Sequence, residues 1–576
     1  MKTQLLSLIY LFATAISLNA QEPEYLWARQ LSGNSDDEFN DVATDLDGNS
    51  YMTGYFNSGS VTFAGQTFTG SPGGTAILVK RNPTGGLVWA RTISGCRALA
   101  VSTDASGNCS ITGQIMSVTA SASIGNITLT NTLGGDVFFI ARYNSNGDVL
   151  WAKTVAEGNL AGSEPRAIQC DASGNSYLMG MYYGGQPANF GNGLLPNEGV
   201  SDVFLLKYTA EGNLEWSKHL GGSSAEQAAD ISVDAAGNVI VVGGYNSAVF
   251  SCDGLQLLNP SGLLPTGGRK EIFVVKYTAA GAIVWAKNAE GNGEDIAQGV
   301  STDASGNIYV SGQFNGDSLN WNDELVVNTD NTPISNIYSD IFVAKLDASG
   351  SAVWLKSYGS ANINGINEDI GFGIQSTADG ISYVCGFFSG SEITFGTQTL
   401  TNIGFEDFFI LAMDADGGEL WAKSSGIENG SAYAYNVAFD AFENVFVAGY
   451  FDADFGTIFN FGNISITSNS AGDGFMVKLG ANTVDIQSPE RKPILRFFPN
   501  PSSGIVSIDL NANLMQGNSI LHVYDLLGKE VLNMSLTSLY STIKIGALLP
   551  DGIYVMKVLD STGNILGAER LVLQHD

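Results

Sequence analysis

Short stretches of strand length that are rich in apolar residues recur along most of this chain. In one unit there are four such stretches. Apolar and polar residues alternate in Ala228–Asp234, whereas Asn238–Tyr245, Ile272–Tyr277 and Ala282–Lys287 are mostly apolar. Glycine and asparagine stand in the turns between them, where the backbone often adopts positive φ. Each unit is therefore predicted to form four antiparallel strands.

The unit occurs seven times, and a tryptophan marks the fourth strand each time. The seven tryptophans are Trp27, Trp89, Trp151, Trp216, Trp285, Trp354 and Trp421. A basic residue follows two positions after each of them: Arg29, Arg91, Lys153, Lys218, Lys287, Lys356 and Lys423. Because both occur in every unit, we expect a scaffold role in which the indole covers the gap between neighbouring units. Repeated four-stranded units of this length predict a β-propeller.

The two ends of the repeat array complement each other. The last unit has no tryptophan-bearing fourth strand, whereas the chain begins with an isolated one, Tyr25–Arg29. Adding this strand to the last unit closes the ring and removes an exposed sheet edge. We therefore predict an all-β protein in which residues 21–481 form a seven-bladed β-propeller, with the N-terminal strand closing the last blade.

The repeat resembles the SBBP repeats of bacterial exported proteins. The resemblance rests on the turn Asp104–Asn108 (DASGN), on the third strand Asp340–Lys345 (DIFVAK) and on the fourth-strand sequence Val284–Lys287 (VWAK). It implies a β-propeller in an exported protein. The sixth unit departs from the pattern, with Ala412 where most units have lysine.

A different pattern begins after the repeats. Residues 482–492 are polar and predict a linker, and residues 493–576 contain short strand signals that predict a small, immunoglobulin-like β-sandwich. Three segments, Phe498–Gly504, Val523–Val531 and Leu549–Val558, resemble the type A sorting domain of the type IX secretion system of Bacteroidota. The residues that carry this resemblance are Pro499, Asn500, Pro501, Gly528, Lys529, Gly552, Ile553 and Tyr554. It implies that the type IX secretion machinery is a partner.

The first residues have the pattern of a secretory signal peptide. Lys2 precedes an apolar run, Leu5–Leu18, and Ala20 is a small residue suited to cleavage, so residues 1–20 are predicted to be removed on export. The run is too short to span a membrane, and we expect no transmembrane segment in the mature chain. The expected location is extracellular or attached to the cell surface, after passage of the outer membrane.

The composition excludes several classes of partner and of functional site. The net charge of −31 disfavours nucleic acid as a partner. The five cysteines, scattered through the repeats, do not form a disulfide framework and are expected to be small buried residues. With only three histidines, the propeller can hold neither a histidine-rich metal site nor a Ser-His-Asp triad.

Two groups of residues are candidates for ligand binding. Acidic pairs precede the first strand of several blades and are expected to converge near the mouth of the propeller channel. Hairpins between the second and third strands are expected on the same face, and one of them carries a tryptophan outside the repeat register. The candidates are Glu294, Asp295, Glu368, Asp369, Trp321, Asp323 and Glu324. Solvated loop charge and plain hairpin packing remain the alternatives.

One turn is the best candidate for a metal. Asp45, Asp47 and Asn49 offer oxygen ligands of the kind that calcium prefers, although they are fewer than an EF-hand supplies. A purely structural turn is the alternative, so no cofactor is expected, and calcium is the one that remains possible.

These observations favour a non-catalytic binding or scaffold protein whose loop face engages a glycan or a protein. The alternative is an extracellular polysaccharide hydrolase or lyase that uses carboxylates at the channel mouth. A third hypothesis is a quinone-dependent dehydrogenase, because those enzymes also use tryptophan-marked propellers. The sequence leaves open the ligand, the oligomeric state and whether the protein is released or anchored.

Overall fold

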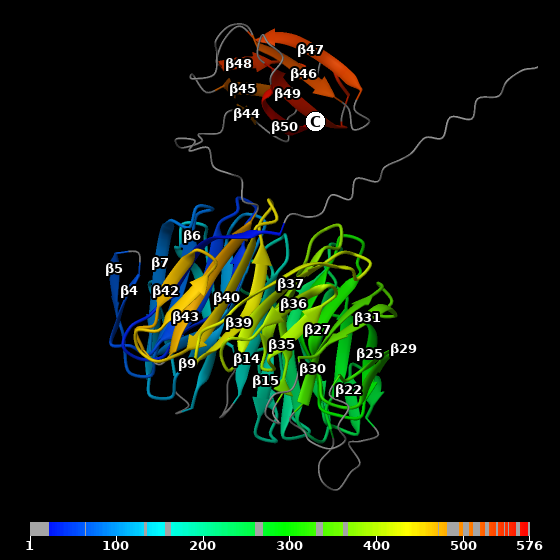
Figure 1. Cartoon of the computed structure of the whole chain (residues 1–576). Coiled ribbons are helices and arrows are strands. Elements are labelled where there is room, and N and C mark those ends of the chain that lie inside the picture. Colours follow the sequence, from blue (N-terminus) through cyan, green and yellow to red (C-terminus); the bar gives the residue numbers. More distant parts are fainter. Residues whose placement is uncertain are drawn as a thin grey trace, which may run out of the picture. The chain divides into compact units, whose positions relative to one another are not determined.

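The computed structural model (Figure 1) divides into two compact units, Met1–Asn482 and Thr483–Asp576. It describes residues 22–63, 65–131, 135–155, 163–259, 269–329, 338–360, 367–470, 472–480, 495–498, 506–510, 519–524, 529–536, 540–545, 548–550, 552–559 and 565–573. The predicted signal peptide and the predicted linker lie outside the described residues. None of the described residues forms a helix long and apolar enough to cross a membrane.

The described part of the first unit consists of β-strands, and seven sheets repeat one four-stranded order. We call them repeat sheets one to seven. The first contains β2 (Asp37–Thr44), β3 (Ser50–Phe56), β6 (Thr75–Arg81) and β7 (Leu87–Ser94). The second contains β8 (Cys96–Thr103), β9 (Cys109–Ile115), β12 (Val137–Tyr143) and β13 (Val149–Thr154). The third contains β14 (Glu164–Cys170), β15 (Ser176–Tyr183), β18 (Ser201–Tyr208) and β19 (Leu214–Gly221).

The other four repeat sheets follow the same order. The fourth contains β20 (Glu226–Val233), β21 (Val239–Tyr245), β24 (Glu271–Tyr277) and β25 (Ile283–Gly291). The fifth contains β26 (Asp295–Thr302), β27 (Ile308–Phe314), β30 (Tyr338–Leu346) and β31 (Ala352–Tyr358), with β32 (Asn367–Glu368) paired to β30. The sixth contains β33 (Ile370–Ser376), β34 (Ser382–Phe388), β37 (Asp407–Met413) and β38 (Glu419–Ser425). The seventh contains β39 (Ser431–Phe439), β40 (Val445–Asp452), β43 (Gly472–Gly480) and β1 (Glu24–Leu31).

The seventh repeat sheet takes its outer strand from the beginning of the chain. β1 pairs antiparallel with β43, and Trp27 stands opposite Lys478. This is the pairing predicted from the complementary ends of the array. The first strand of each repeat sheet contacts the first strand of the next, and β39 of the seventh contacts β2 of the first. The seven first strands therefore form an unbroken series of contacts that runs from β2 to β39 and back to β2.

A hairpin connects the second and third strands of each repeat sheet. The hairpins are β4 (Ser60–Phe63) with β5 (Gln66–Thr69), β10 (Ser121–Ile124) with β11 (Ile127–Thr130), β16 (Ala188–Asn189) with β17 (Leu194–Leu195), β22 (Val249–Cys252) with β23 (Leu255–Leu258), β28 (Ser318–Trp321) with β29 (Glu324–Val327), β35 (Glu392–Phe395) with β36 (Gln398–Thr401), and β41 (Ile458–Phe461) with β42 (Ile464–Thr467). β22 pairs with β19, and β28 pairs with β25. These two hairpins therefore extend the outer edge of the preceding sheet.

Two side-chain contacts recur from sheet to sheet: one joins neighbouring sheets and the other lies within a sheet. Each of Trp89, Trp151, Trp216, Trp285 and Trp354 donates its indole N–H to a turn carbonyl of the next repeat sheet, at 2.8–3.2 Å. The expectation that the tryptophans bridge neighbouring units is confirmed for these five. Within a sheet, a buried third-strand cation pairs with the aspartate of the turn between the first two strands. The pairs are Lys80–Asp45, Arg142–Asp104, Lys276–Asp234 and Lys478–Asp440.

The second unit contains two sheets. One has the order β44 (Leu495–Phe498), β45 (Val506–Leu510) and β48 (Tyr540–Ile543). The other has the order β47 (Glu530–Leu536), β46 (Ser519–Tyr524), β49 (Gly552–Leu559) and β50 (Ile565–Leu573). Apolar side chains from both sheets, including Val523, Met556 and Ile543, share one buried core.

Candidate functional site

Every first strand of a repeat sheet contains a β-bulge at the same point. In β2 the pairing register shifts between Phe39 and Asp41, so Asn40 has no partner on β3. The other six first strands shift at the equivalent place. A bulge redirects a side chain out of the regular alternation of a strand. The seven bulged residues, which we call the bulge ring, are Asn40, Leu99, Arg166, Ala229, Gln298, Phe372 and Tyr435.

All seven residues of the bulge ring line the same two cavities between the first strands. The mouth cavity, of ≈ 430 Å³, also takes in residues that precede the bulges, such as Glu38, Pro165 and Gln227. The inner cavity, of ≈ 340 Å³, extends along the strands to Thr44 and Gln169. Side chains that differ in every sheet thus converge on one place.

Two aromatic residues line the mouth cavity, and three further aromatic rings pack beside them. Phe372 and Tyr435 of the bulge ring lie 5.8 Å apart, edge to face. Tyr433 stacks on Tyr435 at 6.4 Å and on Tyr450 at 6.4 Å, and its ring contacts Phe387 at 5.0 Å. We call these five residues the aromatic arc. Their rings come from the sixth and seventh repeat sheets, and all but Phe387 are only partly buried.

Charged and amide side chains also line the mouth cavity, beside the apolar Leu99, Pro165, Ala228 and Ala229. Arg166 is exposed, and its guanidinium lies 2.9 Å from the Glu164 carboxylate. Burial raises the pKa of Glu38, and the Tyr55 hydroxyl and nearby Arg97 partly offset this effect. The amides of Asn40, Gln227 and Gln298 can both donate and accept hydrogen bonds. This mixture of aromatic and amide groups suits a polar ligand with apolar faces.

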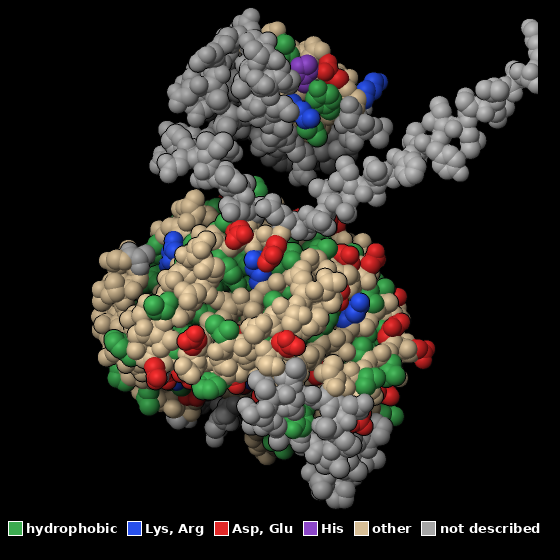
Figure 2. Space-filling model, viewed as in Figure 1, with side chains coloured by type: hydrophobic (Ala, Val, Ile, Leu, Met, Phe, Trp, Pro, Cys, Tyr) green, Lys and Arg blue, Asp and Glu red, His purple; other side chains and the backbone are tan. Residues whose placement is uncertain are grey.

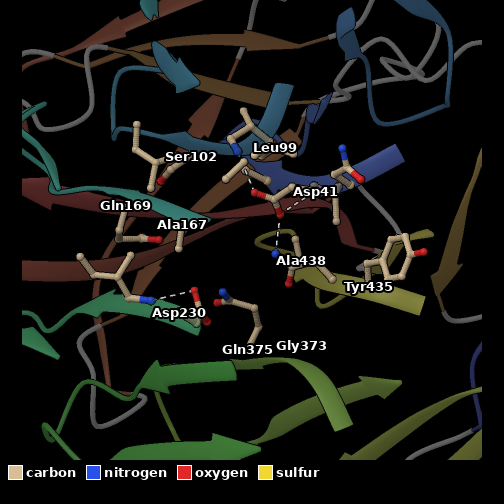
Figure 3. A pocket seen from close by; sticks show the side chains of 18 of the residues that line it. Asp41, Leu99, Ser102, Ala167, Gln169, Asp230, Gly373, Gln375, Tyr435 and Ala438 are labelled. Atoms are coloured by element: carbon tan, nitrogen blue, oxygen red, sulfur yellow. Dashed lines mark hydrogen bonds between the residues drawn. The ribbon is translucent and has the colours of Figure 1, made fainter. Parts of the chain in front are cut away.

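Two carboxylates, of which Asp41 is buried and Asp230 half-buried, face the inner cavity (Figure 3). Asp41 accepts hydrogen bonds from the amides of Val42 and Val101, each at 2.7 Å, and from the Asn436 side chain. Asp230 accepts from the amides of Ile231 and Val300, at 2.8 and 2.9 Å. Burial raises the pKa of Asp41 to about 7 and that of Asp230 to about 6. Because Val101 and Val300 belong to the next repeat sheet in each case, both carboxylates tie neighbouring first strands together.

The four acidic loop candidates do not gather at the mouth cavity. Asp295 and Asp369 are fully buried, and Asp369 accepts hydrogen bonds from Ser360 and from the amide of Ser389. Glu294 pairs with Lys270 at 3.4 Å, and Glu368 is exposed. None of the four lines either cavity. This corrects the expectation of convergence: Asp295 and Asp369 point into the gap between sheets, where at least Asp369 closes a loop.

Trp321 is also not where a ligand could reach it. Its side chain is 0% exposed and packs edge to face on Phe342, at 6.3 Å. The hairpin that carries it lies against β25, so the apolar side of the hairpin seals the outer edge of the preceding sheet. This corrects the ligand-binding hypothesis for Trp321 in favour of hairpin packing. Asp323 and Glu324 remain exposed at the tip of the hairpin.

In the candidate calcium turn, the Asp45 carboxylate is already bound by other groups of the protein. The Asp45 carboxylate lies 3.3 Å from the Lys80 ammonium and accepts hydrogen bonds from the amides of Asp47 and Asn49. The Tyr51 hydroxyl donates to it as well. Among the residues that the structure describes, no group of three or more His, Cys, Asp and Glu side chains is arranged to hold a metal ion.

The cysteines lie in strands of the first unit, and the described sorting residues lie in the second unit. The five cysteines, Cys96, Cys109, Cys170, Cys252 and Cys385, are free and buried, as expected. In the second unit, Gly552, Ile553 and Tyr554 begin β49, and Lys529 is exposed just before β47. Pro499, Asn500, Pro501 and Gly528 lie outside the described residues.

The repeat sheets and the separate C-terminal unit define the class of protein: an all-β protein of the propeller type with a second β-domain. Residues 26–59 match the family model described as Beta-propeller repeat (SBBP), and residues 496–574 match the one described as Secretion system C-terminal sorting domain. The chain therefore carries an SBBP repeat and a type IX sorting domain. Such a sorting domain indicates export across the outer membrane, to the cell surface or beyond.

Individual proteins are similar over parts of the chain. An uncharacterized WD repeat-containing protein of Acanthamoeba polyphaga mimivirus is 25% identical over 399 residues, which are 59% of this chain and 28% of that protein. The β-propeller domain of the Trilobed protease from Pyrococcus furiosus has a TM-score of 0.38 at 8% identity, covering 76% of this chain and 96% of the other. PorZ, a surface component of the type IX secretion system of Porphyromonas gingivalis, has a TM-score of 0.17 at 10% identity, covering 95% and 100%.

Proposed function

We propose that this is an exported, non-catalytic binding protein whose ligand, a glycan or a protein, occupies the mouth cavity. The observation that carries the proposal is the bulge ring. The strands around it repeat the same contacts from sheet to sheet, yet the seven bulged side chains are Asn, Leu, Arg, Ala, Gln, Phe and Tyr. Recognition of an asymmetric ligand requires different side chains at equivalent positions, and the bulge ring supplies them.

The architecture behind this proposal is a closed ring. We infer that the seven repeat sheets are the blades of a seven-bladed β-propeller and that the second unit is an immunoglobulin-like sandwich. The contacts between successive first strands, and between β39 and β2, support the ring. Export begins, in this proposal, with a signal peptide over residues 1–20, and the mature protein is released or held at the cell surface.

The aromatic arc favours a ligand with flat apolar faces. Sugar rings and amide-bearing peptides both present such faces next to polar groups, and aromatic side chains that become buried on binding contribute much of the binding free energy at many interfaces. Arg166 and the amides of the bulge ring then orient the ligand through hydrogen bonds. No proton transfer is required of any of these groups.

A binding experiment on the full chain tests the proposal. We expect saturable binding to members of a glycan array or a peptide array, and the double variant Phe372→Ala/Tyr435→Ala should weaken it at least about tenfold. The matched control is Val88→Ala/Leu150→Ala, which removes two exposed side chains from outer strands and should leave affinity unchanged. Binding that survives in the Phe372 and Tyr435 variant would move the site away from the bulge ring.

The same array decides the role of calcium. Repeating the measurement with a chelator should leave binding unchanged if Asp45, Asp47 and Asn49 only form a turn. Loss of binding in the chelator, restored by calcium, would assign that turn a metal.

A hydrolase remains the second candidate because Asp41 and Asp230 face one cavity with raised pKa values. A general acid needs such a shift. Both carboxylates are already engaged by backbone amides, which favours a structural role. Release of products from a polysaccharide panel, abolished by Asp230→Asn, would establish the enzyme instead.

A further inference from the structure

A third cavity lies where the sixth and seventh repeat sheets meet. It measures ≈ 320 Å³ and shares no lining residue with the bulge ring. Phe405, which precedes β37, and Phe455, which follows β40, both line it and are 63% and 80% exposed. Burying such rings would stabilise the fold, so two exposed phenylalanines at one cavity mark a surface for a partner. We call this cavity the phenylalanine pocket.

Acidic side chains surround the two rings. Asp452 and Asp454 are exposed and line the phenylalanine pocket. Burial raises the pKa of Asp452, and the neighbouring carboxylates of Asp36, Glu406 and Asp454 raise it further, which places four like charges close together. No lysine or arginine is among the described residues that line the pocket. Its negative potential is therefore available to a cation from outside.

We propose that the phenylalanine pocket docks an arginine side chain of an extended partner polypeptide. A guanidinium group is weakly hydrated, stacks on aromatic faces and forms paired hydrogen bonds with carboxylates, so the two Phe rings and the two Asp carboxylates complement it. An anionic glycan would be repelled by the same carboxylates. The site is independent of the proposed function because it uses none of the bulge-ring residues.

The charge of the whole protein acts in the same direction. Acidic residues outnumber basic ones, 57 to 26, and on the face seen in Figure 2 few Lys or Arg side chains lie between the Asp and Glu side chains of the repeat unit. Such a field speeds the approach of a basic partner but does not hold it in one place. The phenylalanine pocket supplies the local complementarity.

The test uses two labelled peptides and the full chain in about 150 mM salt, where general charge attraction is screened. One peptide alternates glycine with arginine, and the other replaces every arginine with citrulline, a neutral isostere. Fluorescence anisotropy should show binding of the arginine peptide, and the citrulline peptide should bind at least about tenfold more weakly.

Three variants locate the binding. Two double variants remove the proposed contacts, Phe405→Ala/Phe455→Ala and Asp452→Asn/Asp454→Asn. Each should lower the affinity for the arginine peptide at least about tenfold. The matched control is Phe442→Ala/Glu443→Gln, which removes an exposed phenylalanine and an exposed acid from the turn that joins β39 to β40. It should change the affinity less than about twofold, and circular dichroism should show all variants folded.

Several outcomes would overturn the proposal. If the Phe442 control loses as much affinity for the arginine peptide as the pocket variants, the binding is nonspecific charge attraction. If the citrulline peptide binds as tightly as the arginine peptide, the pocket does not recognise the guanidinium group. A neutral oligosaccharide that competes for the same four residues would assign the pocket to a glycan. The bulge-ring variant Phe372→Ala/Tyr435→Ala should leave the affinity for the arginine peptide unchanged. Failure of the arginine-docking proposal and failure of the proposed function are therefore separate results.

Discussion

Buried carboxyl groups occupy the ends of several strands in the first unit. Glu226, at the start of β20, accepts hydrogen bonds from Ser247 and faces Asp202 at the start of β18. Burial raises the pKa of Glu226 to about 8, and the Asp202 carboxylate adds to the shift. Burial raises the pKa of Glu271 and of Asp369 to about 7. Each of these carboxyl groups is held in the folded protein where burial favours its protonated form.

These shifts predict a stability that falls as pH rises. Because the pKa of Glu226 is raised on folding, its contribution is complete below about pH 4.5 and is lost as pH rises through about 8. Chemical denaturation at a series of pH values should show this decline, and Glu226→Gln should flatten it by on the order of 1–3 kcal/mol. Exposed Glu392→Gln is the control. An identical decline in Glu226→Gln would assign the pH dependence to other groups.

Single residues differ in how far the sequence determines their role. The tryptophans repeat in every unit, so a shared structural contact could be predicted, and five of them make it. Trp321 occurs once, and an isolated aromatic on a hairpin gives no sign of which side of the hairpin is covered. The side of the hairpin that is buried is set by its pairing with β25 of the preceding sheet, and the local sequence pattern does not encode that pairing.

At the scale of the element, the turn between the third and fourth strands fits under a tryptophan of the preceding sheet. The turn glycines Gly85, Gly147, Gly212, Gly281, Gly350 and Gly417 all have φ of 78–84°. A Cβ atom on any of them would lie only 2.6–3.1 Å from the indole of the preceding tryptophan. Each glycine thus serves both the turn and the contact between sheets.

This double role predicts a larger cost than backbone strain alone. Gly212 has φ of 81°, and a Cβ there would lie 2.6 Å from the Trp151 ring, whereas Gly254 has φ of 87° and open space around it. Gly254→Ala should cost about 1–2 kcal/mol through strain. Gly212→Ala should cost a further 1–3 kcal/mol, roughly, because the indole must move. Denaturant unfolding compares the two, and equal losses would mean that the tryptophan contact adapts freely.

The bulges could have been recognised in the sequence from a change in the spacing of buried residues along each first strand. A regular strand buries every second residue, but Phe39 and Val42 are both buried and three positions apart, as are Ala98 with Val101 and Ala228 with Ile231. The extra residue is the one that reaches the cavities. Four strands per unit could be predicted from short apolar stretches and the turns between them, whereas the site lies where the bulge interrupts the regular burial pattern of the first strand.

At the scale of the molecule, the seventh sheet depends on residues from both ends of the array. β1 buries Trp27 and Leu31 in the core shared with the first sheet, and Ala28 in the core shared with the sixth. Lys478 of β43 donates to the carbonyl of Pro83 in the first sheet. The pairing was predictable because a missing strand and an isolated strand are both visible in the sequence. The placement of the hairpins was not, because it depends on contacts between units.

The position of β1 predicts that the chain can be complemented in trans. A chain that begins at Asn34 lacks β1, exposes the edge of β43 and should unfold at a lower denaturant concentration than the full chain. A peptide of residues 22–33 should pair with that edge and restore stability in proportion to its concentration, because it binds only the folded state. The control peptide carries Trp27→Ala and Leu31→Ala, keeps its backbone hydrogen bonds and should not restore stability, since the buried side chains supply most of the binding free energy. Equal rescue by both peptides would mean that β1 only covers an edge. Unchanged stability of the shortened chain would mean that the seventh sheet does not need β1 to remain folded.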